Sequence, residues 1–229
     1  MIGVLQFGGS NCDRDVKKVL DSMGVESELI WYKNSVKHCD GIVLPGGFSY
    51  GDYLRAGAIA ARAPVMQEVR EIASNGKPVL GICNGAQILC ESGMAQGAYA
   101  QNLSAKFQCE WTRLRVETTD SPFTQEFTEG DTIEIPIAHG EGRYIPKDIN
   151  DLYSKDKVLF KYVDENGEPT GEANPNGSAD NIAGVVGETR NVAAMMPHPE
   201  RASDELLGSD DGRKILEGMV ENALASVTR

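Results

Sequence analysis

The chain lacks the features of three large classes of protein. It has 22 basic residues against 34 acidic ones, whereas nucleic-acid binders depend on basic patches. No apolar run approaches the length that crosses a bilayer. Its five cysteines are an odd number with no C-x-x-C pair, which disfavours a disulfide framework and favours a reducing compartment. We therefore expect a cytoplasmic protein without a signal peptide and without a nucleic-acid or membrane partner.

The common signatures of cofactor sites are also missing. No G-x-x-x-x-G-K-S/T phosphate-binding loop occurs, and Gly76-Lys77-Pro78 stands in the wrong context for one. No group of histidines and cysteines has the spacing of metal ligands. We expect no metal and no cofactor in this chain.

The first third of the chain alternates short apolar runs with amphipathic segments. The predicted strands are 2–7, 26–31, 41–44 and 78–82, and the predicted helices are 13–23, 54–61 and 64–73. Asn11 is the expected cap of the first helix. This alternation is typical of an α/β fold, a mostly parallel sheet that helices cover on both faces.

After Gly97 the pattern becomes strand-rich. Residues 106–117 and 132–138 alternate apolar and polar side chains, as half-buried antiparallel strands do. Further strands are predicted at 157–163, 181–186 and 191–196, and 212–226 predicts a closing amphipathic helix. No linker or repeat interrupts the chain, which predicts a single domain over residues 1–229.

The most informative segment is Val79-Leu80-Gly81-Ile82-Cys83-Asn84-Gly85-Ala86-Gln87. An apolar run ends at Gly-x-Cys-x-Gly and an amphipathic stretch follows, which predicts a strand, a tight turn and a helix with one cysteine at the apex. Such an elbow lifts a nucleophile clear of the sheet. A buried cysteine in an ordinary turn is the competing interpretation.

Pro197-His198-Pro199-Glu200 follows the last predicted strand. Pro199 favours an extended backbone at His198, and side chains two residues apart in an extended chain share a face. Glu200 can then accept a hydrogen bond from one ring nitrogen of His198 and orient the imidazole. The other ring nitrogen is free to accept a proton from Cys83. We therefore predict Cys83, His198 and Glu200 as catalytic residues.

A glycine pair, Gly46-Gly47, follows the predicted strand 41–44. Sites in such sheets form at the carboxyl ends of strands, where glycines let backbone N–H groups approach a ligand closely. We predict that Gly46 and Gly47 form an oxyanion and substrate site, in which the Gly47 and Asn84 amides are the donors.

Together these pieces resemble the triad (class I) glutamine amidotransferases, which share a glycine-rich oxyanion strand, a G-x-C-x-G elbow and a late H-P-E. Further segments resemble one branch of that family, the glutaminase subunits of phosphoribosylformylglycinamidine synthases. They are Gly8-Gly9-Ser10-Asn11-Cys12-Asp13-Arg14-Asp15, Gly46-Gly47-Phe48-Ser49-Tyr50-Gly51-Asp52, Ala138-His139-Gly140-Glu141-Gly142-Arg143-Tyr144 and Asn174-Pro175-Asn176-Gly177-Ser178. Gly8 departs from the proline of many relatives. The resemblance covers nearly the whole chain and implies a flavodoxin-like fold.

The resemblance implies that the Cys83 thiolate attacks the side-chain amide of glutamine, so that ammonia leaves and water hydrolyses a γ-glutamyl thioester. Gln87, one helical turn after Cys83, is a candidate glutamine contact, and Gly51-Asp52 is a candidate wall of the same site. His139 is either a structural loop histidine or a residue that shapes the interface side of the site.

The implied partners are a large synthetase subunit and a small bridging subunit. The large subunit is expected to bind ATP and magnesium and to use the ammonia to convert formylglycinamide ribonucleotide to formylglycinamidine ribonucleotide in de novo purine biosynthesis. Docking is expected to complete the glutaminase site.

Three alternatives stay open. The chain could supply ammonia to pyrimidine, histidine or tryptophan synthesis, although the His139 and Asn176 segments argue against this. It could be a free-standing cysteine hydrolase or redox chaperone, whose histidine usually follows the elbow closely. It could be a non-catalytic subunit, which would not need Cys83, His198 and Glu200 together.

Overall fold

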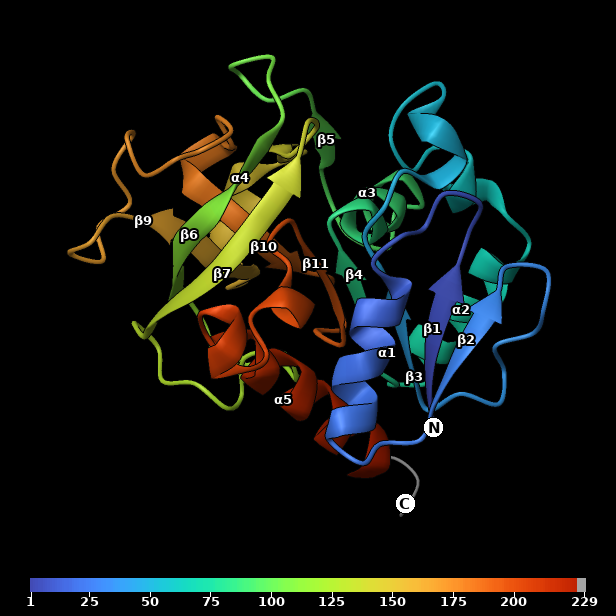
Figure 1. The fold of residues 1–229 in the computed structure, drawn as a ribbon. Helices are drawn as coiled ribbons and strands as arrows, with labels where there is room; N and C mark the ends of the chain where they lie inside the picture. The colour runs from blue at the N-terminus through green and yellow to red at the C-terminus, as the bar shows by residue number, and fades with distance from the viewer. Residues whose placement is uncertain (226–229) are drawn as a thin grey trace.

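A nine-stranded sheet runs through the molecule in the order β2-β1-β3-β4-β11-β10-β9-β6-β7. The computed structural model describes residues 1–225. The single domain over residues 1–229 stays a prediction. Residues 226–229, which include the last residue of the predicted helix 212–226, lie outside the described residues. Figure 1 shows the sheet with helices packed against it.

The first part of the sheet is parallel, as the alternation of strands and helices predicts. It contains β2 (Ser27–Trp31), β1 (Ile2–Gln6), β3 (Gly41–Leu44), β4 (Val79–Ile82) and β11 (Val192–Met195). Strands β1, β3, β4 and β11 are almost wholly buried because helices cover both faces. These helices are α1 (Asp13–Ser22), α2 (Val65–Ser74), α3 (Asn84–Glu91) and α5 (Asp211–Ala225).

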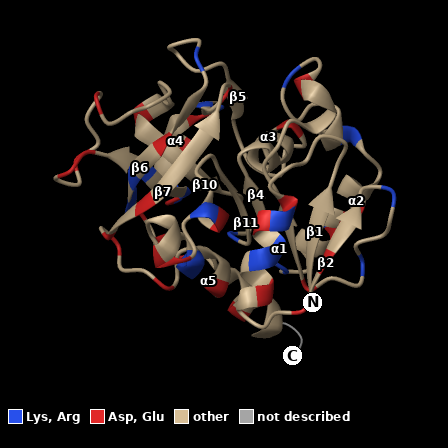
Figure 2. Ribbon diagram, in the orientation of Figure 1, with Lys and Arg blue, Asp and Glu red and all other residues tan. Residues whose placement is uncertain are grey.

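The second part of the sheet is antiparallel, also as predicted. It continues through β10 (Ile182–Val186), β9 (Val158–Val163), β6 (Gln108–Val116) and β7 (Thr132–His139). Strand β7 alternates exposed or half-buried residues with buried ones, which is typical of a sheet with one solvent face. In Figure 2, acidic positions stand out on the loops that follow β9 and that join β6 to β7.

Two local predictions are wrong. Residues 54–61 do not form a helix: only the short 3-10 helices η1 (Ser49–Asp52) and η2 (Ala60–Arg62) lie nearby. Leu54 and Gly57 have φ angles of 72° and 81°, which an α-helix cannot contain. Asn11 does not cap α1, because the residue at the cap position is Cys12 and no side chain caps the helix.

Three short elements were not predicted. Strands β5 (Ala98–Ala100) and β8 (Arg143–Ile145) pair as a separate two-stranded sheet, and α4 (Ile149–Ser154) follows them. Each is too short to show a clear hydrophobic period. Within the described residues, no helix has the length and apolar character needed to cross a membrane.

Candidate active site

Cys83 stands at a strained elbow between β4 and α3. It is the residue before the first turn of α3 and has φ 50° and ψ −107°, a conformation that costs free energy in any residue except glycine. A side chain at Gly85 would place its Cβ 1.9 Å from the carbonyl oxygen of Leu44. The glycine therefore lets α3 pack directly on β3, and this packing presents Cys83 at the carboxyl edge of the sheet.

His198 and Glu200 form a buried pair after β11. The backbone N–H of His198 donates to the carbonyl of Pro136 on β7 at 2.9 Å, and Pro199 opens the 3-10 helix η4 (Pro199–Arg201). Nδ1 of His198 lies 2.6 Å from Oε1 of Glu200, and both side chains are almost completely buried. The carboxylate accepts this hydrogen bond and thereby fixes the imidazole ring.

Neighbouring strands bring Cys83 and His198 together. β4 and β11 pair in parallel with Ile82 opposite Met195, and the N–H of Cys83 donates to the carbonyl of Met195 at 2.8 Å. Burial opposes a charged His198, but the charge of Glu200 and the nearby sulfurs of Cys83 and Cys12 outweigh it and raise the pKa of His198 well above its usual value. Nε2 is buried and makes no hydrogen bond with any described residue.

Gly46 and Gly47 lie next to this pair. A Cβ at Gly46 would stand 2.8 Å from Cε1 of His198, so only a glycine lets the histidine ring lie against the chain here. Gly47 has φ 150° and packs against the backbone of Gly9 and Ser10. The Asn84 N–H begins α3, where backbone donors have no partner within the helix. The predicted oxyanion residues thus lie on the loop and helix beside Cys83 and His198.

The side chains of Asn84 and Gln87 connect two loops to the start of α3. Asn84 Oδ1 accepts from the N–H of Ser49 at 3.1 Å, and its Nδ2 donates to Gln87 Oε1 at 2.9 Å. Gln87 Nε2 donates to the carbonyl of Glu141 at 2.8 Å. Gln87, predicted as a glutamine contact, therefore holds the loop of Glu141 close to the elbow.

Asp52 lies on the loop that follows Gly46-Gly47. Its Oδ1 atom is buried and has no hydrogen-bond partner among the described residues. Burial, together with the charge of Glu141, raises the pKa of Asp52 to about 6. Asp52, Tyr50 and Leu54 all have positive φ angles, so this loop is held in a strained shape. Two carboxyl groups therefore act on each other next to the elbow.

His139 is the second buried histidine at this edge. Its ring lies 3.2 Å from Asn102 Oδ1 and 3.4 Å from Asn176 Nδ2, and a Cβ at Gly142 would stand 2.3 Å from it. Burial, with the nearby His198, lowers the pKa of His139 to about 4. A neutral His139 thus joins the segment 138–144 to the segment 174–178 in a closed hydrogen-bond network.

Sequence reasoning missed Cys12 and Arg201. Cys12 Sγ accepts from Arg201 Nη2 at 3.1 Å, and Cys12, His198 and Glu200 offer ligand atoms within 4.8 Å of one another. Hydrogen bonds already engage Glu200 and Cys12, and the guanidinium opposes a second cation. Cys12 ends the loop that joins β1 to α1. The shared carboxyl edge of β1, β3 and β4 was the signal that could have found it.

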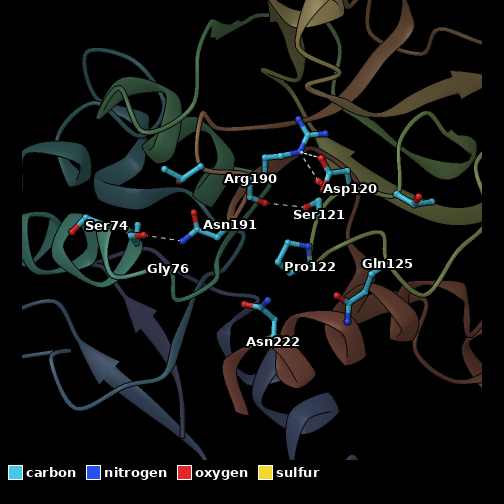
Figure 3. Close-up of a pocket in the computed structure, with 12 residues that line it drawn as sticks. Ser74, Gly76, Asp120, Ser121, Pro122, Gln125, Arg190, Asn191 and Asn222 are labelled. Atoms are coloured by element: carbon cyan, nitrogen blue, oxygen red, sulfur yellow. Dashed lines mark hydrogen bonds and ion pairs between the residues drawn. The ribbon is translucent and has the colours of Figure 1, made fainter. Parts of the chain in front are cut away.

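A separate polar hollow of about 420 Å³ lies at the other edge of the sheet. Asn191, just before β11, and Gly76, shortly before β4, border it together with Ser121 and Asn222 (Figure 3). Asn191 Nδ2 donates to the carbonyls of Ala73 and Lys77. Since Cys83 and His198 follow the opposite ends of these strands, this hollow is separate from the candidate active site.

The comparisons with known proteins agree with this geometry. The family model of the CobB/CobQ-like glutamine amidotransferase domain matches residues 1–217. The chain is 57% identical to phosphoribosylformylglycinamidine synthase subunit PurQ of Methanosarcina barkeri, over 96% of this chain and 97% of that protein. It is 55% identical to the subunit of the same name from Halobacterium salinarum, over 94% and 97% of the two chains.

Solved structures give the same result. A chain in the structure of PurLQS from Thermotoga maritima is 44% identical, covers 96% of this chain and 97% of its own length, and has a TM-score of 0.86. A glutamine amidotransferase from the same organism is 14% identical over 97% of this chain and 97% of its own, with a TM-score of 0.60. The second likeness concerns the fold alone.

Proposed function

This chain belongs to the CobB/CobQ-like glutamine amidotransferase family, and on that premise we propose that it is the glutaminase subunit of a phosphoribosylformylglycinamidine synthase. It hydrolyses glutamine to glutamate and ammonia, and the ammonia serves de novo purine biosynthesis. The observation that carries the chemistry is the placement of Cys83 and His198 after two adjacent parallel strands, with Glu200 hydrogen-bonded to the histidine at 2.6 Å.

The reaction begins when the Cys83 thiol gives its proton to His198 Nε2. The thiolate attacks the side-chain carbonyl carbon of glutamine, and the N–H groups of Gly47 and Asn84 stabilise the oxyanion. His198 returns the proton to the nitrogen, the carbon–nitrogen bond breaks and ammonia leaves. Water then adds to the γ-glutamyl thioester with His198 as base, and glutamate is released. A raised His198 pKa suits this proton transfer, because the imidazolium is stable beside Glu200.

The α-ammonium group of glutamine is the cation that the Asp52 loop would accept. Asp52 has a buried oxygen without a partner among the described residues, and Glu141 is the second negative charge that acts on it. A bound ammonium group would relieve this repulsion. Asp52→Asn is expected to raise the KM for glutamine more than it lowers kcat, and an unchanged KM would contradict this role.

The ammonia is used by a different chain. The partner is the large synthetase subunit, which converts formylglycinamide ribonucleotide to formylglycinamidine ribonucleotide with ATP and magnesium bound there. A small bridging subunit completes the complex. The similar Thermotoga maritima chain belongs to a structure of PurLQS, and that likeness supports this arrangement. A cytoplasmic location fits the five free cysteines of the described chain.

A coupled assay tests the function. The chain is mixed with the synthetase and small subunits of its own organism, ATP, magnesium, formylglycinamide ribonucleotide and glutamine labelled with ¹⁵N in the side-chain amide. Label is expected in formylglycinamidine ribonucleotide, and glutaminase turnover is expected to rise when the other subunits are present. Label transfer by a Cys83→Ala variant would contradict the proposed chemistry, and equal glutaminase rates with and without the partners would contradict the coupling.

A further inference from the structure

A guanidinium lies beside the Glu200 carboxylate without a hydrogen bond to it. Arg201 Nε is 4.0 Å from Glu200 Oε1, whereas a hydrogen bond between a guanidinium and a carboxylate spans about 2.8 Å. Glu200 Oε1 accepts from His198 at 2.6 Å, and Glu200 Oε2 is buried and has no hydrogen-bond partner among the described residues. A buried carboxylate oxygen without a donor is unfavourable, so the open gap between Arg201 and Glu200 needs a cause.

The sulfur of Cys12 keeps this gap open. Arg201 Nη2 donates to Cys12 Sγ at 3.1 Å, and the Cys12 thiol donates to Asn11 Oδ1 at 3.2 Å. The thiol is therefore engaged both as an acceptor and as a donor. One end of the guanidinium is held at the loop before α1, and Arg201 reaches Glu200 only at the outer limit of an ion pair.

The backbone fixes the place of the Cys12 sulfur. Cys12 is buried and directly precedes α1, and its N–H donates to the carbonyl of Gly46 at 3.2 Å. A Cβ at Gly46 would stand 3.0 Å from Cys12 Sγ and 2.8 Å from His198 Cε1. The missing side chain of Gly46 thus leaves room for the sulfur next to the imidazole ring, and Cys12, His198 and Glu200 offer polar atoms within 4.8 Å of one another.

A guanidinium bound directly to Glu200 would harm the base. Burial opposes the imidazolium of His198, and the charge of Glu200 is the main effect that raises its pKa. Arg201 on Glu200 would compete with His198 for the carboxylate and would repel the imidazolium. The charged and titratable groups that act on His198 or lie beside its carboxylate come from four parts of the chain: Glu200 and Arg201 on η4, Cys83 before α3, Cys12 before α1 and His139 on β7.

Arg201 stays charged in this position. Burial opposes its charge, but the Cys12 sulfur and the carboxylates of Glu200 and Asp15 outweigh burial and raise the pKa of Arg201. A permanent cation therefore lies next to a buried carboxylate that has one oxygen unpaired. If the sulfur were removed, Glu200 would be the nearest acidic group for the released guanidinium, and a short movement would close the ion pair.

We infer that Cys12 is a positioning residue for the His198–Glu200 pair. Its sulfur holds the Arg201 guanidinium away from the carboxylate, so that Glu200 stays paired with His198 alone. This inference rests on the proposed function, in which that pair supplies the base of the glutaminase reaction. Cys12 acts through Arg201 and takes no part in the covalent steps.

Three variants test the role of Cys12 in the complete complex. Cys12→Ala removes the acceptor, so Arg201 is expected to close on Glu200. The kcat for glutaminase should fall about 10- to 100-fold with little change in KM, and the alkaline limb of its pH profile should move to lower pH. Cys12→Ser keeps a donor and an acceptor and should retain most of the activity. Cys12→Ala combined with Arg201→Met removes the competing cation and should regain most of the lost kcat.

Matched controls separate this effect from simple loss of packing. Cys39→Ala removes another buried cysteine and should keep its rate per folded molecule. Arg213→Met removes an arginine whose side chain is 33% exposed, against 37% for Arg201, and should not restore activity to Cys12→Ala. Only the loss of the Arg201 charge is expected to suppress the defect of Cys12→Ala.

An NMR titration of the full chain gives a readout that does not need activity. The chain has three histidines, and ¹⁵N-labelled imidazoles report each of them separately. The titration of His198 is expected to move to lower pH in Cys12→Ala and to move back when Arg201→Met is added.

The outcomes decide the inference and the proposed function separately. An unchanged His198 titration in Cys12→Ala, or a loss of kcat that Arg201→Met does not relieve, would mean that Cys12 only fills space, and the inference would be wrong while the proposed function stands. If the unmodified complex hydrolyses no glutamine, the proposed function falls, and the titration still decides whether Cys12 keeps Arg201 from the His198–Glu200 pair.

Discussion

The two catalytic turns are built by different physical means. Cys83 is held by the backbone: its φ of 50° is strained, and Gly81 and Gly85 leave no room for a Cβ. His198 has an ordinary φ of −103°, and a hydrogen bond to Glu200 in a buried environment holds its ring. The nucleophile is therefore positioned by packing and strain, and the base is positioned by charge. A change of backbone should damage the first turn, and a change of charge should damage the second.

Removal of the sulfur should give the largest effect. Cys83→Ala is expected to lower glutaminase turnover by about 10⁴-fold or more, as the loss of a covalent nucleophile does. The fold should survive, because Cys83→Ala keeps the Cβ and removes one small group. Cys39→Ala, a buried cysteine of the core, is the control and should keep its rate per folded molecule. Comparable activity in the two variants would exclude Cys83 as the nucleophile.

The Glu200 charge should give the next largest effect. Glu200→Gln keeps the size of the side chain and removes the negative charge that raises the pKa of His198. The pKa of His198 should fall, so the alkaline limb of the kcat profile, where the imidazolium is lost, should move to lower pH. Turnover is expected to fall about 10²- to 10⁴-fold.

A pH profile from about 5 to 10 checks this prediction. Glu205→Gln, on the exposed 3-10 helix η5 (Glu205–Leu207), is the control and should follow the unmodified protein. A Glu200→Gln profile of lower height but unchanged pH dependence would mean that Glu200 acts only by packing.

The same contrast explains what the sequence could predict. The Cys83 elbow and the His198–Glu200 pair are local, because each depends on glycine, proline and residue spacing within a few positions. The Arg201 contact with Cys12 joins residues 189 positions apart, so it depends on the order of strands in the sheet. The predicted helix at 54–61 failed because tertiary packing of Gly57 against the backbone of α3 overrides local propensity.

A backbone change at the Cys83 elbow should have the third largest effect, a loss of unfolding free energy. Gly85→Ala places a Cβ 1.9 Å from the Leu44 carbonyl oxygen, and neither backbone can move away without disturbing the sheet. We expect the free energy of unfolding to fall by about 3 kcal/mol, the upper part of the range for overpacking. Denaturant unfolding measures it. Gly171→Ala, where nothing lies within 4 Å of the added Cβ, should unfold nearly as the parent does, and equal losses in both variants would disprove the packing argument.

The smallest expected effect is on the pH dependence of the unfolding free energy, and it concerns the contrast between the two buried histidines, His139 and His198. Burial holds the pKa of His139 near 4, below its ordinary 6.5, whereas the pKa of His198 is raised. The unfolded chain binds a proton at His139 below pH 6.5 and the folded chain does not. His139 therefore removes about 2 kcal/mol of stability between pH 7 and pH 5. A raised pKa acts in the opposite direction, so the stability that His198 contributes is lost only as pH rises.

His139→Gln should reduce the loss of unfolding free energy on acidification, measured by denaturant titration at pH 7, 6 and 5. The readout is the slope of unfolding free energy against pH. A constant offset between the parent and the variant reports only how well glutamine fits beside Asn102 and Asn176. Parallel curves for the parent and the variant would show that folding does not lower the pKa of His139, and the contrast between the two histidines would then be wrong.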